Sequence, residues 1–143
     1  MPVVFRNHRK DIEDCIEISR SNPIQLSEHY HSNDCFSDDD DAQRGFVHPA
    51  LLALMEEVCR RTGKRYRFLS AFRSPEHNAS VGGADDSTHL YGMGGDIIPP
   101  EDTLDWDKDL RELDDILPSL CGGYKYYKEK RFTHADVGKV RRW

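Results

Sequence analysis

The chain has 143 residues, of which 37% are hydrophobic and 32% charged, and this fits one soluble domain with its own core. Its net charge of −6 and its scattered basic residues argue against a nucleic-acid-binding protein. No apolar run approaches the roughly eighteen residues of a membrane span, so we expect no contact with a membrane.

The N-terminal sequence and the cysteines give only weak indications of compartment. MPVVFRNHRKDIEDC lacks the apolar stretch and the small-residue cleavage site of a signal peptide. The four cysteines lie far apart and form no C-x-x-C pair: Cys15, Cys35, Cys59 and Cys121. We expect free thiols, with a disulfide that involves Cys35 as the alternative. The localisation is therefore left open.

The first predicted element is a helix over residues 8–20, because Ile12 and Ile16 fall on one helical face. Ser21-Asn22-Pro23 would end this helix. Residues 1–23 are accordingly interpreted as an N-terminal helical extension of a single domain.

A polar segment follows, with four consecutive aspartates from Asp38 to Asp41. Their mutual repulsion favours a solvated loop. A calcium loop would need alternating ligands and a glycine at its sixth position, and this run has neither. His29 and His31 resemble a second metal pair, but an H-x-H pair in a polar loop is weak evidence for a site.

The clearest helix lies in VHPALLALMEEVCRRTGK, where Pro49 suits the first turn and Gly63 the C-terminal cap. Its apolar residues repeat at intervals of three and four and predict a buried face: Leu51, Leu54, Met55 and Val58. Tyr66, Phe68 and Ser70 then alternate along a predicted strand. Further elements follow: a short helix from Ser74-Pro75, a strand at 96–98, a helix over 105–117, and a hairpin with strands at 124–127 and 131–137. Without repeats or a linker, this order predicts one α+β domain.

Two segments far apart in the chain carry metal-ligand residues. His89 and Asp96 are joined by a glycine-rich run that permits a tight bend. His134 and Asp136 alternate on a predicted strand, so both point to one face and can reach one site. Two histidines and one carboxylate are typical of a catalytic zinc site, which keeps a fourth position for water. Asp136 would then orient a ligand or act as a general base.

The segment SAFRSPEHNASVGGADDSTHLYGMGGD resembles peptidase family M15, the zinc D-alanyl-D-alanine carboxypeptidases and murein endopeptidases. The shared pattern is S-x-x-R-S-x-x-x-N, then G-G-A, then S-x-H-x-x-G-x-x-x-D. The ending GGYKYYKEKRFTHADVGKVRRW is also similar to that family's ending. The resemblance covers residues 24–143 and implies a small antiparallel sheet packed against helices, the fold shared with hedgehog signalling domains. Where many relatives have Arg-Ala-x-Asp, this chain has Met93-Gly94-Gly95-Asp96, whose extra glycine we expect to loosen the bend.

The resemblance also implies roles for residues. His89, Asp96 and His134 would ligate one zinc ion per chain, and zinc lowers the pKa of a bound water to about 7. Arg73 matches an arginine that steadies the substrate carbonyl or the developing oxyanion. Related enzymes place a Glu or His base a few residues before the last ligand. Glu129 is the acid in that window and Asp136 is its rival, and the sequence does not separate them.

The leading hypothesis is a zinc-dependent metallopeptidase that cleaves peptide bonds in peptidoglycan stem peptides, as a carboxypeptidase or as an endopeptidase of endolysin type. We expect a monomer with no nucleic-acid partner. The lack of a signal peptide is consistent with a phage or virus lysin. The competing hypothesis is a non-catalytic zinc-containing module with the same fold. Arg73 and a reachable acid distinguish the two, because a structural zinc site needs neither.

Overall fold

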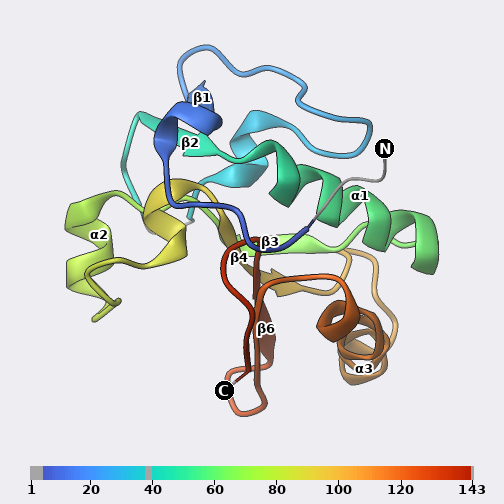
Figure 1. Cartoon of the computed structure of the whole chain (residues 1–143). Coiled ribbons are helices and arrows are strands. Elements are labelled where there is room, and N and C mark those ends of the chain that lie inside the picture. The colour runs from blue at the N-terminus through green and yellow to red at the C-terminus, as the bar shows by residue number, and fades with distance from the viewer. Residues whose placement is uncertain (1–4, 38–39, 143) are drawn as a thin grey trace.

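Five strands form the main sheet of the structure, a computed structural model that describes residues 5–37 and 40–142 (Figure 1). Their order across the sheet is β3 (Arg67–Ser70), β4 (Gly94–Ile98), β6 (Phe132–Asp136), β5 (Gly123–Tyr127) and β7 (Arg141–Arg142). Neighbouring strands are antiparallel except β5 and β7, which run parallel. Asp38, Asp39 and Trp143 lie outside the described residues.

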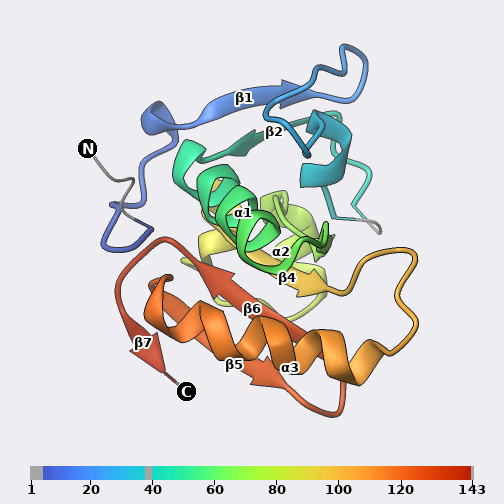
Figure 2. The same cartoon turned by 90° about the vertical axis from the view of Figure 1, so that its right-hand side faces the viewer.

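Helices lie on both sides of this sheet. α1 (Pro49–Thr62) and α3 (Trp106–Ile116) cover one face, whereas α2 (Pro75–Ser80) and the 3₁₀ helix η3 (Thr88–Tyr91) lie on the other side (Figures 1 and 2). Strand β6 contributes side chains to both faces of the sheet, because successive side chains of a strand point to opposite faces. Its Thr133 hydroxyl donates to Asp114 of α3 at 2.8 Å. The neighbouring His134 therefore faces away from α3, toward the side of α2 and η3.

The expected helix over residues 8–20 is wrong. Only Ile12–Asp14 form a short 3₁₀ turn, and Ile16–Ser19 form strand β1, which pairs antiparallel with β2 (Arg44–Val47). Ile16 and Ile18 fit a strand period as well as a helical one, because Glu17 alternates between them. Burial decides between the two: Ile18 is 2% exposed but Ile12 is 44% exposed, so no continuous helical face is buried.

The other predicted elements lie close to their expected positions, whereas strands β2 and β7 were not predicted. Pro49 begins α1, and Gly63 caps it in the left-handed conformation with a φ of 69°. Ser74 caps α2 by accepting a hydrogen bond from the His77 amide, and Asp105 caps α3 by accepting one from the Lys108 amide. The α+β fold class is confirmed.

The core lies between α1, α3 and the sheet. Its fully buried residues include Leu51, Leu54, Met55, Val58, Ile97, Leu110 and Leu113. Tyr66 directly precedes β3, and its hydroxyl donates a hydrogen bond to the carbonyl of Asp109 in α3 at 2.6 Å, which ties this helix to the sheet. All four cysteines are free thiols, as expected. Within the described ranges, we find no helix with the length and apolarity needed to cross a bilayer.

Candidate metal centre

Three neighbouring strands place a row of polar side chains on one face of the sheet. In the strand register, Ser70 of β3 lies opposite Asp96 of β4, and Asp96 lies opposite His134 of β6. Directly opposed side chains in antiparallel strands lie about 5 Å apart. The sheet therefore brings Asp96 and His134 together although 38 residues separate them in the sequence.

His89 reaches this row from η3. The helix ends at Gly92, whose φ of 65° lets the chain turn from η3 into β4. The expected loosening of the bend by an extra glycine is wrong, because Gly94 and Gly95 are strand residues of β4. Gly94 leaves space for its neighbours: a Cβ atom there would lie 2.4 Å from the Thr88 hydroxyl and 3.2 Å from the His134 ring.

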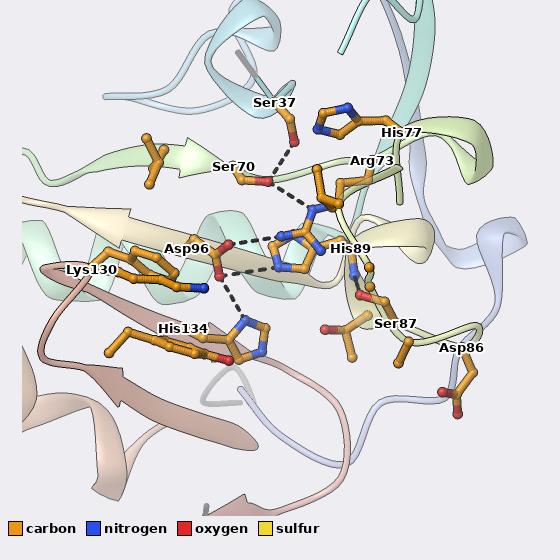
Figure 3. A pocket seen from close by; sticks show the side chains of 18 of the residues that line it. Ser37, Ser70, Arg73, His77, Asp86, Ser87, His89, Asp96, Lys130 and His134 are labelled. Carbon is orange, nitrogen blue, oxygen red and sulfur yellow. Dashed lines mark hydrogen bonds and ion pairs between the residues drawn. The ribbon is translucent and has the colours of Figure 1, made fainter. Parts of the chain in front are cut away.

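The three side chains direct one ligand atom each to a common point (Figure 3). Oδ1 of Asp96 lies 3.3 Å from Nε2 of His89 and 3.1 Å from Nδ1 of His134. All three residues are buried. His89 Nδ1 lies 2.6 Å from the carbonyl oxygen of Ala71, and His134 Nε2 lies 2.8 Å from Oδ2 of Asp136. Each of these outer nitrogens faces an acceptor and so carries a proton.

This arrangement fits a cation. With protons on their outer nitrogens, neutral His89 and His134 both turn a lone pair toward the Asp96 carboxylate. Three acceptor atoms facing one another repel unless a proton or a metal ion lies between them. Two imidazoles and a carboxylate are also a common ligand set for zinc. The donor set therefore fits a zinc ion with three protein ligands.

Electrostatics at the centre favour charged forms of its acidic groups. Burial alone would raise the pKa of Asp96, but hydrogen bonds with His134 and His89 outweigh it and lower the pKa. Burial alone would lower the pKa of His134, but hydrogen bonds to Asp136 and Asp96 raise it to about 9. Burial lowers the pKa of His89. Without a metal ion, His134 thus holds the proton that a metal ion would displace.

Asp136 lies behind His134 and has no exposed surface. Its Oδ1 accepts hydrogen bonds from the Gly123 amide at 2.8 Å and from the Gly138 amide at 3.0 Å. Its Oδ2 faces His134 Nε2 and also lies 3.5 Å from the Arg141 guanidinium. The carboxylate is therefore fully engaged and is placed to orient the His134 ring.

Arg73 contacts the other oxygen of Asp96. Its Nη2 donates to Asp96 Oδ2 at 3.1 Å, its Nε to the Ser70 hydroxyl at 3.3 Å, and its Nη1 to Asn78 at 3.4 Å. The Ser70 hydroxyl in turn lies 2.7 Å from that of Ser37. These contacts hold the guanidinium at the wall of a cavity of about 790 Å³, whose lining includes His89, Asp96 and His134 (Figure 3).

The cavity wall includes residues to which the sequence interpretation gave no role. His77 of α2 and Lys130 of the β5–β6 turn line it, as do Tyr127 and Phe132. Among the described residues that line it, Glu129 does not appear; this side chain lies on the exposed turn between the two strands. The structure thus brings together Arg73, His89, Asp96, His134 and Asp136, and it leaves Glu129 outside.

The expectation of a solvated acidic loop is wrong for Asp40, which is 4% exposed. Its carboxylate accepts hydrogen bonds from the Ser74 amide at 2.7 Å, from the Ser74 hydroxyl at 3.0 Å and from the Ala42 amide at 3.0 Å. Burial alone would raise the pKa of Asp40, but these hydrogen bonds outweigh it and lower the pKa. Asp40 thereby ties the acidic segment to the residue that follows Arg73. A run of aspartates gives no local signal for such a contact.

Comparison with known families explains this arrangement. The chain matches the family described as Peptidase M15 over residues 25–136. The chain belongs to peptidase family M15. Neither the curated proteins nor the solved structures compared with it gave a match. The matched range contains all three residues of the buried group, His89, Asp96 and His134. Members of family M15 are generally zinc-dependent metallopeptidases.

Proposed function

We propose that this M15 chain is a zinc-dependent metallopeptidase that hydrolyses peptide bonds in the stem peptides of bacterial peptidoglycan. The observation that carries the proposal is the convergence of three buried ligand atoms, from His89, Asp96 and His134, beside Arg73 in one cavity. A zinc ion held by these atoms supplies an activated water and polarises the scissile carbonyl. The remaining chemistry belongs to side chains of the chain itself.

Arg73 stabilises the negative charge that develops on the carbonyl oxygen. A guanidinium has five N–H groups, and hydrogen bonds to Asp96, Ser70 and Asn78 fix its plane. The remaining N–H groups are available to a substrate that enters the cavity. Because the guanidinium is held before substrate arrives, little reorganisation is needed during the reaction. A structural zinc site would have no use for this residue.

Asp136 acts as a positioning residue and not as the proton carrier. It has no exposed surface and it already accepts hydrogen bonds from two backbone amides. Proton transfer then falls to His77, which lines the cavity. Glu129 lies on the turn after β5, outside that lining, and is the alternative that the family pattern implies. The pH–rate profiles of His77→Gln and Glu129→Gln identify the group, because removing the base abolishes one limb of the profile.

Hydrolysis of defined stem peptides tests the proposal. The zinc-loaded protein is incubated with a peptide that ends in D-Ala-D-Ala and, separately, with a crosslinked dimer, so that carboxypeptidase and endopeptidase activities are distinguished. We expect one of the two to be cleaved, and we expect His134→Ala to lower the zinc content by one ion per chain and to abolish cleavage. Intact zinc content without cleavage of either substrate would instead favour a non-catalytic zinc module.

A further inference from the structure

A second group of ligand-type side chains shares no residue with the cavity of the metal centre. Glu56 and Cys59 lie three positions apart on α1, so they occupy the same side of that helix. His29 comes from the segment between β1 and the 3₁₀ helix η2 (Ser32–Cys35). The imidazole, the carboxylate and the thiol each offer one atom, and all three atoms lie within 4.8 Å of one another.

The Glu56 carboxylate is already oriented toward His29. Its Oε2 accepts hydrogen bonds from the Ser27 hydroxyl at 2.6 Å and from the His29 amide at 2.8 Å. Its Oε1 lies 2.5 Å from Nδ1 of His29. The segment from Ser27 to His29 is thus fastened to α1 through one carboxylate, whose Oε1 turns toward the imidazole. One oxygen of this carboxylate also lies within 4.8 Å of the Cys59 sulfur.

Cys59 is the buried member of the group. The residue is 7% exposed, and its Sγ lies 3.5 Å from the hydroxyl of Tyr30. The Tyr30 hydroxyl has one proton, which it donates to the carbonyl of Tyr66 at 2.6 Å. The thiol is therefore the donor in the contact with Tyr30, and its sulfur receives no proton from that hydroxyl. Burial raises the pKa of Cys59, so the thiol stays protonated until a soft cation displaces the proton.

The surroundings have an excess of negative charge. The hollow beside the group, of about 930 Å³, is lined by three carboxylates (Glu28, Glu56 and Glu57) and two guanidiniums (Arg60 and Arg61). Both guanidiniums pair with Glu57, at 2.6 Å and 3.1 Å. The nearby Arg65 pairs with Asp34 at 2.9 Å. The arginines thus pair with other carboxylates, and Glu56 pairs with the His29 imidazole within 4.8 Å of the thiol.

We propose that His29, Glu56 and Cys59 form a second zinc site, which ties the segment around His29 to α1. One thiolate, one imidazole and one carboxylate suit a borderline-soft divalent ion such as zinc and do not suit magnesium or calcium. Tetrahedral bonds of about 2.0–2.3 Å place ligand atoms about 3.5 Å apart. His29 Nδ1 and Glu56 Oε1 lie 2.5 Å apart and would have to separate by about 1 Å. His29 can make this adjustment because it lies on an exposed bend. The fourth position is open to water or to Glu28.

Cobalt substitution tests this site independently of the metal centre, since only the second site contains sulfur. A thiolate bound to Co²⁺ gives an intense near-ultraviolet charge-transfer band, and the His89–Asp96–His134 group cannot give one. We expect two Co²⁺ ions per chain of 143 residues and this band. His134→Ala should lose one ion and keep the band, whereas Cys59→Ser should lose one ion and the band. Failure of the catalytic proposal and failure of this one are therefore distinguishable.

Because Cys59 is buried, Cys59→Ser could lose the ion by misfolding, and a second variant at an exposed ligand separates this effect from loss of the site. His29→Gln changes a side chain that is 40% exposed and should also lose one ion and weaken the band at least tenfold at limiting Co²⁺. His31→Gln is the matched control, because the His31 side chain caps η2 and does not belong to the group, so both ions should stay in place. A wild-type chain without the band, or a band that survives Cys59→Ser, overturns the proposal.

Discussion

Replacing Asp136 with asparagine tests the assignment of protons at the metal centre. Asp136→Asn keeps an oxygen that can accept from the amides of Gly123 and Gly138, so the backbone contacts survive. The other carboxylate oxygen, 2.8 Å from His134 Nε2, becomes an NH₂ group. Two donors would then face each other. His134 must respond by moving its proton to Nδ1, the atom that faces Asp96 and that would bind the proposed zinc ion.

The expected magnitude follows from the lost hydrogen bond. A hydrogen bond to a charged group contributes about 1.5–3 kcal/mol, and each 1.4 kcal/mol corresponds to about tenfold in affinity. Outer residues that orient a metal-binding histidine typically contribute about 10–100-fold in metal affinity. We therefore expect Asp136→Asn to weaken zinc binding at the metal centre by about 10–100-fold.

Chelator competition at pH 7 measures this zinc affinity, and peptide hydrolysis at zinc concentrations well above the new Kd measures the consequence. Thermal unfolding in the presence of chelator provides the control for folding. We expect kcat to recover when the site is filled, because the variant binds zinc weakly but keeps its catalytic groups.

Two results would contradict this reasoning. Unchanged zinc affinity would mean that His134 does not bind zinc through Nδ1. A kcat that stays low with the site filled would mean that Asp136 carries a proton in the reaction, as one sequence hypothesis held.

Three further predictions concern other residues in and around the cavity. Arg73→Lys should lower kcat by about 10²–10³-fold without loss of zinc, because lysine cannot reproduce the fixed fork of donors; equal kcat values would contradict this. Asp40→Ala should lower the free energy of unfolding by about 2 kcal/mol at pH 7. The folded-state pKa of Asp40 is lowered, so its stabilising contribution is present above the unfolded pKa of about 3.9 and is lost as the pH falls through the folded-state pKa. Chemical denaturation at pH 7 and in acid checks that the difference in unfolding free energy between wild type and variant shrinks in acid. Gly94→Ala should destabilise the fold by about 1–3 kcal/mol, because the new Cβ would lie 2.4 Å from the Thr88 hydroxyl, and an unchanged unfolding midpoint would refute it.

The parts of the fold that local signals determine could be predicted. α1 has a proline at its start, a glycine at its end and a buried face at helical spacing, so sequence periodicity located it closely. The N-terminal segment was mispredicted because Ile12, Ile16 and Ile18 fit two periods at once. Only pairing with β2, which lies beyond the acidic segment, selects the strand. Such a partner cannot be inferred from local spacing.

At the metal centre too, local sequence signals predicted some features, and contacts between distant segments determined the others. The spacing of His89 and Asp96 and the alternation of His134 and Asp136 indicated one site before any fold was known. Their roles depend on contacts that cross the sequence, such as the bond between Asp136 and Gly123. The convergence of His29 with Glu56 and Cys59 was equally out of reach, because the spacing paired His29 with His31, whose side chain caps η2.

The position of Asp96 between β3 and β6 also bears on folding. The row from Ser70 through Asp96 to His134 exists only when three strands have paired, and their partners are distant in sequence. Pairings of this kind form late, because the loops between them must close first. Refolding chains should therefore acquire their high-affinity metal site only in the final cooperative step. A metal-sensitive probe would then time the closure of the sheet, and not the earlier formation of α1.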